Sequence, residues 1–401
     1  MPTLLQINVT ANSGSHGRIA DEIGQLAIER GWRSVIAYGR WANPSKNELI
    51  RIGTNFGIKE HGLESRFLDN HGLASRCATR SFIQQIKEIK PDVIHLHNIH
   101  GYYLNYRLLF DYLNSTEIPV VWTFHDCWPF TGHCAHFVSV KCERWKKRCV
   151  NCPLSGDYPK SFVDNSSRNF LLKRNLFTAN DNLHIVAVSD WLAGLIRQSF
   201  FREKDIHVIK NGVNLDVFKP QANQVVIKKR ILGVSNVWNK AKGLYDFYAL
   251  RERLNKNEYE IVLVGLNLKQ IKTLPDGIIG IQHTESVSEL VELYSSAYVL
   301  VNPSYADTFP TVNLEALACG TPVVTYQTGG SPEAVDGGTG IVVAQGDINA
   351  LTDAIVEICK IDRTQIIQSC RERAIRLFDN NARYEDYISV YQQVIAQRDR
   401  L

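Results

Sequence analysis

The sequence lacks any long hydrophobic run. Its first apolar stretch, residues 3–9, is too short for a signal peptide, and no later stretch approaches the ~18 apolar residues that a membrane span requires. These absences disfavour both a membrane-spanning protein and a secreted one. We therefore expect the protein to act in the cytoplasm.

A strong charge of one sign is also missing. The formal net charge is +4 and the pI is about 8.5, with acidic and basic residues interspersed along the chain. This mild balance does not demand a nucleic-acid partner, and we expect none. It is compatible with a local basic surface that touches anionic lipid, which would place the protein at the inner face of the membrane.

Length and pattern indicate two α/β domains. The 401 residues exceed what one hydrophobic core usually supports, and 44% hydrophobic residues suffice for two cores. Short β-rich runs alternate with amphipathic segments such as 19–30 and 75–90, which predicts βαβ units and parallel sheets. The expected strands are 4–9, 34–38, 93–97, 120–124 and 185–189 in the first half, and 230–234, 261–264, 299–302 and 322–326 in the second.

Turn residues cluster in segment 210–220, where we place the linker between the domains. The first domain is then residues 1–210, with a cysteine-rich insert at 127–152. The second domain is residues 211–383. A final segment, 384–401, carries aromatic and aliphatic residues spaced for a packed helix.

Two carboxylates eight positions apart, Asp307 and Glu315, are the most informative feature of the chain. A helix is predicted to begin near Pro310 and to end at Gly320. Its leading N–H groups suit a phosphate, and a carboxylate one turn further in suits the hydroxyls of a sugar or ribose. An ordinary βα unit is the alternative, because acidic residues favour helix starts for electrostatic reasons alone. A second glycine-rich turn at 328–340 favours the ligand-binding interpretation.

The whole run resembles the donor-binding signature of glycosyltransferase family 4, in which an acid is followed after seven residues by a Glu inside Glu-Ala-x-Ala-x-Gly-x-Pro-Val-Val. Asp307 stands where the family usually has Glu. The resemblance implies the GT-B fold, with two Rossmann-like doubly wound domains that face a central cleft. It also implies a retaining hexosyltransferase that moves a sugar from a UDP- or GDP-linked donor to a saccharide acceptor, expected to be lipid-linked, in polysaccharide or lipopolysaccharide biosynthesis.

The family's donor-site roles map onto this motif. The resemblance implies that Asp307 faces the sugar, that Glu315 faces the ribose or nucleotide, and that amides after Pro310 hold phosphate. The other donor-binding residues implied here are Thr308, Phe309, Pro310 itself, Thr311 and Leu314. In the family the linker is a hinge and the last helix crosses back onto the first domain.

Segment 233–243 occupies the place of the family's Gly-Arg…Lys-Gly loop, whose two cations hold the donor diphosphate. Lys242 fits the Lys and is followed by the required glycine. The Arg is missing, with Ser235 or Asn236 in its place, and Lys240 is a candidate for the second charge. No Asp-x-Asp triplet occurs in the chain, so the usual metal–nucleotide bridge of other glycosyltransferases is absent. We expect catalysis without a divalent ion or other cofactor.

The first domain offers two more candidate segments. Small residues at 12–18 stand where the family has its glycine-rich loop, so Gly14 and Gly17 are expected to allow close backbone approach and Arg18 to contact phosphate. As a plain βα turn this loop needs no function. His125 follows the strand at 120–124 and matches a family histidine that contacts the donor sugar, although a single histidine at a strand end is more often structural.

Three histidines near the end of another strand form a separate group. Alternation along a strand puts His95 and His97 on one face, so we expect at least one of them in the core. We expect His97 and His100 to line the acceptor pocket rather than to bind a metal.

Five of the nine cysteines crowd into segment 127–152. Disulfides are disfavoured in a cytosolic chain, and thiols clustered with a Cys-x-x-Cys pair indicate a metal site. One structural zinc ion is the simplest assignment, an iron–sulfur cluster is the alternative, and unligated thiols are the third interpretation. The basic run at 141–148 would then be displayed toward an anionic acceptor or lipid headgroup. The expected zinc ligands are Cys134, Cys142, Cys149 and Cys152.

Two other functions stay open at this point. A nucleotide-sugar epimerase of the same fold also binds a nucleotide between two such domains, but it lacks the acid-x7-Glu block. A non-catalytic nucleotide-binding module is favoured only by the missing Arg. The sequence does not determine the nucleotide base, the donor sugar, the acceptor, the linkage or the oligomeric state.

Overall fold

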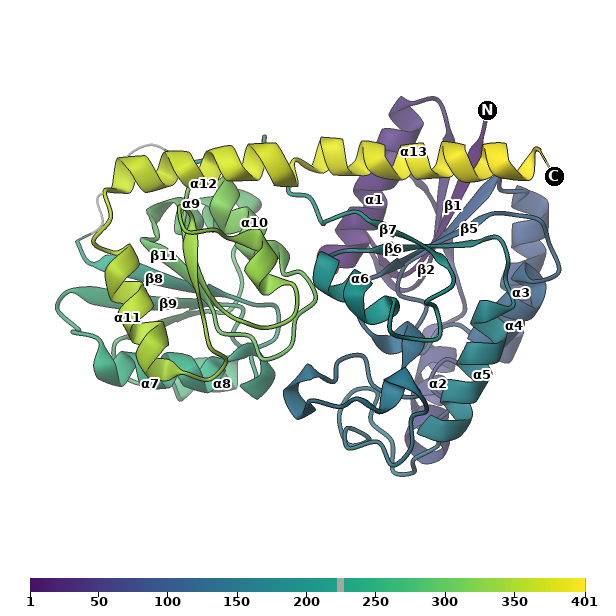
Figure 1. The fold of residues 1–401 in the computed structure, drawn as a ribbon, viewed down its shortest axis with the longest axis horizontal. Helices are drawn as coiled ribbons and strands as arrows, with labels where there is room; N and C mark the ends of the chain where they lie inside the picture. Colours follow the sequence, from purple (N-terminus) through teal and green to yellow (C-terminus); the bar gives the residue numbers. More distant parts are fainter. Residues whose placement is uncertain (222–226, 401) are drawn as a thin grey trace. The chain divides into compact units, whose positions relative to one another are not determined.

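The computed structural model describes residues 1–221 and 227–400. It contains two compact units, Met1–Lys210 with Arg383–Leu401, and Asn211–Ala382. Each unit has one parallel sheet covered by helices (Figure 1). The predicted α/β class with two doubly wound sheets is therefore confirmed. Among the described residues, no helix has both the length and the apolar character needed to cross a membrane.

The first unit has a seven-stranded sheet of order β3-β2-β1-β4-β5-β6-β7. The order runs outward in both directions from β1 and β4, so a topological switch point lies between these two strands. The strands are β1 (Thr3–Ala11), β2 (Arg33–Ala42), β3 (Glu48–Arg51), β4 (Val93–Leu96), β5 (Val120–Phe124), β6 (Leu183–Ala187) and β7 (Asp205–Val208). The helices are α1 (Gly14–Glu29), α2 (Asn55–Leu68), α3 (Arg76–Ile89), α4 (Tyr106–Leu113), α5 (Ser166–Thr178) and α6 (Asp190–Ile196).

The second unit has a six-stranded sheet of order β10-β9-β8-β11-β12-β13, with its switch point between β8 and β11. The strands are β8 (Lys229–Val234), β9 (Tyr259–Val264), β10 (Ile278–Ile281), β11 (Val299–Asn302), β12 (Val323–Tyr326) and β13 (Gly340–Val343). The helices are α7 (Leu244–Arg253), α8 (Leu268–Lys272), α9 (Val287–Ser296), α10 (Thr311–Ala318), α11 (Ile348–Ile358) and α12 (Arg363–Phe378).

The central strands are buried because helices cover both faces of each sheet. Leu4, Leu5 and Ile7 on β1 are fully buried, although consecutive strand residues point to opposite faces. This burial explains why the central strands read as nearly continuous apolar runs in the sequence.

The last helix, α13 (Asn380–Arg398), supplies part of the core of the first unit. Figure 1 shows it in yellow beside α1. The Tyr391 hydroxyl lies 2.6 Å from His95 Nδ1, and the Tyr384 hydroxyl donates to Glu22 at 2.6 Å. The helix begins earlier than expected because Asp379 accepts a hydrogen bond from the N–H of Asn381. Its residues in the core cluster are Tyr384, Tyr387, Ile388, Val390, Tyr391 and Val394.

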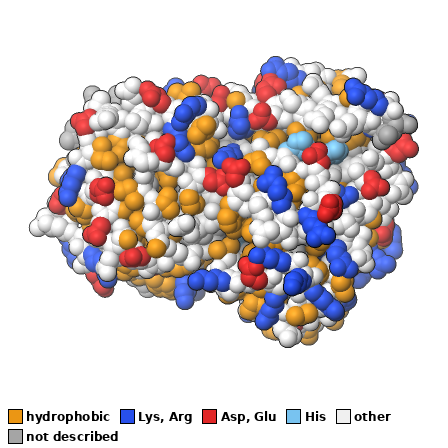
Figure 2. Space-filling view, viewed as in Figure 1, with side chains coloured by type: hydrophobic (Ala, Val, Ile, Leu, Met, Phe, Trp, Pro, Cys, Tyr) orange, Lys and Arg blue, Asp and Glu red, His pale blue; other side chains and the backbone are white. Residues whose placement is uncertain are grey.

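The cysteine-rich insert, residues 127–152, follows β5 and contains three short 3-10 turns in place of helices or strands. These turns are η1 (Trp128–Phe130), η2 (Val138–Val140) and η3 (Arg144–Lys146). Lys and Arg side chains gather at the lower end of the first unit in Figure 2, where the insert lies. The exposed cations of the insert are Lys141, Arg144, Lys147 and Arg148.

Candidate functional site

The switch point of the second unit brings together two residues that separate motifs predicted. Lys242 lies in the loop after β8, and Asp307 lies in the loop after β11. Lys242 Nζ is 2.7 Å from Asp307 Oδ2, across 65 positions of sequence. Ligands of open α/β sheets bind outside the carboxyl ends of strands at such points. The pair therefore lies where this fold places a ligand.

Close backbone packing explains two glycines of these loops. Gly243 has φ +72°, and a Cβ there would lie 2.3 Å from the carbonyl oxygen of Pro303. Gly329 has φ +56°, and a Cβ there would lie 1.7 Å from the carbonyl oxygen of Asp307. A side chain at either position would be strained and would clash. The second glycine-rich turn thus packs directly on the loop that carries Asp307.

Helix α10 begins next to this pair. Its N-cap residue is Pro310, and no side chain caps the helix start. The first N–H groups of such a helix are suited to an anion, since they lack intrahelical partners and the helix dipole is positive there. Thr311, in the first turn of α10, is half-buried.

Glu315 lies one turn inside α10 and is almost fully buried. Its Oε2 accepts a hydrogen bond of 2.8 Å from the hydroxyl of Tyr294 on α9. The tyrosine holds the carboxylate in a fixed position. Tyr294 was not predicted as a site residue, because a tyrosine in an amphipathic helix gives no motif signal.

Three other residues predicted for the donor site have buried side chains. The side chains of Thr308, Phe309 and Leu314 are buried, and the Phe309 ring lies 6.0 Å from that of Phe378. Phe309 and Leu314 are therefore core residues of the second unit, and they offer a ligand only their backbone.

The loop after β8 is exposed where the family's Arg is missing. Asn236 is exposed, and Ser235 Oγ donates to the carbonyl of Val237 at 3.0 Å. Asn239, which was not predicted as a site residue, accepts a hydrogen bond of 3.0 Å from the N–H of Lys242 and so fixes the turn. An Asn three residues before a turn residue is a recognisable capping signal.

Histidines gather near the switch point of the first unit, at the carboxyl ends of β4 and its neighbour β5. His97 Nδ1 lies 3.1 Å from His125 Nε2, and His97 Nε2 lies 3.1 Å from Gln6 Oε1. The amide of Gln6 donates to Ala20, so its oxygen faces His97. His97 then carries its proton on Nε2, and in the neutral pair His125 Nε2 is the donor.

Burial keeps these imidazoles uncharged. Desolvation, with the proximity of the other imidazoles, lowers the pKa of His97 and of His125 well below the usual range. Burial likewise lowers the pKa of His16 to about 4. His16 was not singled out from the sequence, yet its ring centroid lies 5.9 Å from that of His125. Its position in the first turn of α1, directly after β1, is the signal that would have found it.

His95 and His100 have different partners. His95 is fully buried between Thr123, at 2.8 Å, and Tyr391, so it is the predicted core histidine. His100 Nε2 lies 2.9 Å from Asp126 Oδ2. Burial alone would raise the pKa of Asp126, but the charge and hydrogen bond of His100 outweigh it and lower this pKa.

Most of the segment predicted as a small-residue loop, 12–18, lies in α1, which begins at Gly14 and thus earlier than expected. Gly14 has φ +68° and an open environment. A Cβ on Gly17 would lie 2.5 Å from Thr10 Oγ1 on β1, so this glycine is needed for the packing of α1 against β1. Arg18 follows in the first turns of α1 and is half-buried.

Comparison with known proteins gives two family matches. Residues 16–217 match the model described as Glycosyltransferase Family 4, and residues 228–360 match the model described as Glycosyl transferases group 1. The putative colanic acid biosynthesis glycosyl transferase WcaC of Escherichia coli K12 is 22% identical over 420 residues, covering 98% of this chain and all of that protein. A D-inositol 3-phosphate glycosyltransferase of Corynebacterium jeikeium is 46% identical over 189 residues, 40% of this chain and 45% of its own.

Solved structures give the fold. Sucrose-phosphate synthase from Thermosynechococcus elongatus superposes with a TM-score of 0.73 at 18% identity, covering 99% of this chain and 100% of its own. WaaG, a glycosyltransferase involved in lipopolysaccharide biosynthesis, has a TM-score of 0.65 at 15% identity, with 97% and 99% covered. Anabaena HepE in complex with UDP has a TM-score of 0.67 at 15% identity, with 98% and 100% covered. The predicted GT-B fold is confirmed by these likenesses.

Proposed function

Since the chain belongs to glycosyltransferase family 4, we propose that it transfers a sugar from a nucleotide diphosphate to a saccharide acceptor, with retention of configuration, in the assembly of a cell-surface polysaccharide. The observation that carries the donor assignment is the Lys242–Asp307 contact of 2.7 Å beside the uncapped start of α10. The pathway assignment is supported by the full-length match to WcaC.

Each residue of the site has its own role in the proposed donor binding. Lys242 and the first amides of α10 hold the diphosphate and offset the charge that grows on it as the glycosidic bond breaks. Asp307 takes hydroxyls of the sugar, and Glu315, fixed by Tyr294, takes hydroxyls of the ribose. The bond from the anomeric carbon to the phosphate oxygen breaks, a bond to the acceptor oxygen forms on the same face, and the acceptor proton passes to the leaving phosphate.

Catalysis without a divalent ion is part of the proposal. The chain has no Asp-x-Asp triplet to bridge a metal to the donor, and Lys242 supplies the positive charge at the same place. UDP is the proposed nucleotide because the HepE structures hold UDP and UDP-glucose. The acceptor is proposed to be lipid-linked, reached from the cytoplasmic face of the membrane through the histidine-lined side of the first unit.

The test begins with a thermal-shift screen of UDP, GDP and their sugar conjugates, because ligands of the folded state raise its apparent stability. The best donor is then incubated with chelator, with and without candidate acceptors, and the products are analysed by NMR. We expect transfer with an unchanged anomeric configuration. Inversion, a requirement for magnesium or manganese, interconversion of the free nucleotide sugar, or binding without turnover would each reject the proposal, the last two in favour of an epimerase and a binding module.

A further inference from the structure

Four cysteine side chains of the insert surround one small cavity. Cys134, Cys142, Cys149 and Cys152 line it together with the rings of Phe137 and Trp145. All four are free thiols. Cys134 lies between η1 and η2, Cys142 lies between η2 and η3, and Cys149 and Cys152 follow η3, so three separate parts of the insert converge on the cavity.

A buried cation lies beside these thiols. Lys173 on α5 is 1% exposed, and its Nζ donates to the carbonyls of Trp128 at 2.7 Å and Thr131 at 3.0 Å. The same Nζ lies 3.4 Å above the ring of Trp128. Within the described residues Lys173 forms no ion pair with a carboxylate. A buried ammonium group is costly without a negative partner, so this position calls for one.

We propose that the four cysteines hold one Zn²⁺ ion as thiolates and that Lys173 is the buried counter-charge of this site. Zn²⁺ displaces the four thiol protons to water, and four thiolates with one Zn²⁺ carry a net charge of −2, which the ammonium group of Lys173 partly neutralises. The N–H of Gly132 already donates to Cys149 Sγ at 3.3 Å, a hydrogen bond that stabilises a thiolate. Four sulfur ligands leave no open position, so the ion is structural.

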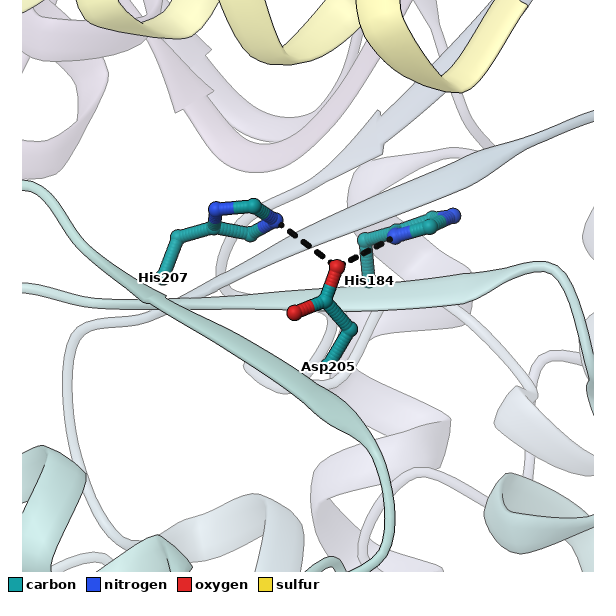
Figure 3. A group of neighbouring side chains, drawn as sticks. All are labelled: His184, Asp205 and His207. Carbon is teal, nitrogen blue, oxygen red and sulfur yellow. Dashed lines mark hydrogen bonds and ion pairs between the residues drawn. The ribbon is translucent and has the colours of Figure 1, made fainter. Parts of the chain in front are cut away.

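A second group of ligating side chains competes for this assignment. His184 Nδ1, Asp205 Oδ2 and His207 Nε2 lie within 4.8 Å of one another on β6 and β7, and no other three ligating atoms among the described residues are as close (Figure 3). The two imidazoles lie 3.3 and 3.1 Å from the carboxylate, which is half exposed. Both imidazoles contact a carboxylate that is half exposed to water, so this group holds no buried charge that needs a counter-charge.

No three of the four thiol sulfur atoms, all of which lie among the described residues, are within 4.8 Å of one another. Tetrahedral coordination at ~2.3 Å brings sulfur atoms to about 3.8 Å from one another, so we expect the ion to draw the turns of the insert together. Ion binding and folding of the insert are then coupled, and chelation should loosen it.

The first experiment measures metal and sulfide in the full chain purified without added metal. We expect one zinc per chain, lost from the Cys149→Ser/Cys152→Ser variant and kept in the His184→Ala/His207→Ala and Cys77→Ser variants. In the unmutated chain, four thiols should react with an alkylating reagent only after chelator is added, a readout that does not depend on the variants folding. Absence of zinc, iron with sulfide, or zinc lost with the histidines instead of the cysteines would overturn the proposal.

The second experiment tests the counter-charge. Lys173→Met keeps most of the packing of the side chain but removes its charge, and Lys147→Met is the control because Lys147 is an exposed cation of the same insert. Mutation of a residue that interacts with metal ligands typically lowers the metal affinity by about 10- to 100-fold. We expect that loss for Lys173→Met in a chelator competition and none for Lys147→Met. Equal zinc affinity in both variants would remove Lys173 from the site.

Discussion

At the scale of single residues, the contact between Lys242 and Asp307 is the ligand-free state of the proposed donor site. The lysine is about one-third exposed and the aspartate less so, so the contact is partly screened by water. A diphosphate offers Lys242 more negative charge than one carboxylate does. Donor binding should therefore release Asp307, which then turns to the sugar.

Removing the cation tests this view. Lys242→Ala should weaken UDP binding by roughly 10- to 100-fold, because a hydrogen bond to a charged group is worth about 1.5–3 kcal/mol. Lys269→Ala removes an exposed lysine of α8 and should leave the affinity unchanged. Isothermal titration with UDP measures both. An unchanged affinity in Lys242→Ala would place the diphosphate elsewhere.

Substitutions of Glu315 and Tyr294 distinguish a contact with the ligand from a contribution to the stability of the fold. Glu315→Gln keeps an oxygen for the Tyr294 hydroxyl but removes the negative charge, so we expect a near-normal melting temperature and a loss of turnover of at least 100-fold. Tyr294→Phe should instead lower the unfolding free energy by about 1 kcal/mol and retain most activity. Equal turnover in Glu315→Gln and the unmutated chain would show that Glu315 is only a structural residue.

At the scale of elements, α13 is a late segment that completes an early core. Its aromatic residues pack with Leu4 and Ile23 of β1 and α1, so the first unit is built from both ends of the chain. Buried tyrosines contribute their ring area and their hydroxyl bonds together. The stability of the first unit should thus be sensitive to single changes in this helix.

Tyr391→Ala is the sharpest such change. It removes a fully buried ring and leaves His95 without one partner, and we expect a loss of about 3–5 kcal/mol. Gln393→Ala lies on the exposed side of the same helix and should change the stability by less than about 0.5 kcal/mol. Urea unfolding followed by tryptophan fluorescence measures the difference, since several tryptophans are in the first unit.

At the scale of the whole molecule, the buried histidines link stability to pH. Burial lowers the pKa of His16 from 6.5 to about 4, and it also lowers the pKa of His97 well below 6.5, so the unfolded chain binds more protons than the folded one below pH 6.5. Their contribution is fully present above pH 6.5 and is lost as the pH falls toward about 4. The melting temperature should therefore decline through this window.

A substitution identifies the source of the decline. His97→Gln should flatten the dependence of melting temperature on pH between 6.5 and 4. His283 is exposed, so His283→Gln should leave this dependence unchanged. The same slope in both variants would mean that other groups titrate in this range.

Much of this architecture was predictable from the sequence, and the exceptions have physical causes. The central strands and the Lys242 and Asp307 motifs were found, because buried strands are continuous apolar runs and glycine-dependent loops leave a sequence pattern. The edge strands of both sheets, β3, β7, β10 and β13, were missed, since short and partly exposed strands carry no such pattern. Tyr294 and Lys173 were missed because their roles arise only from contacts between distant segments.

The shared core of the first unit has a consequence for biosynthesis. During translation, residues 1–210 are complete long before α13 has been made. The apolar residues that pack against α13, such as Leu4 and Ile23, therefore stay exposed to solvent until nearly all 401 residues have been made. The second unit, whose segment is continuous, can fold during this delay. Chains that end prematurely after residue 379 would leave these apolar residues exposed permanently, so we expect chaperones to bind them and proteases to degrade them.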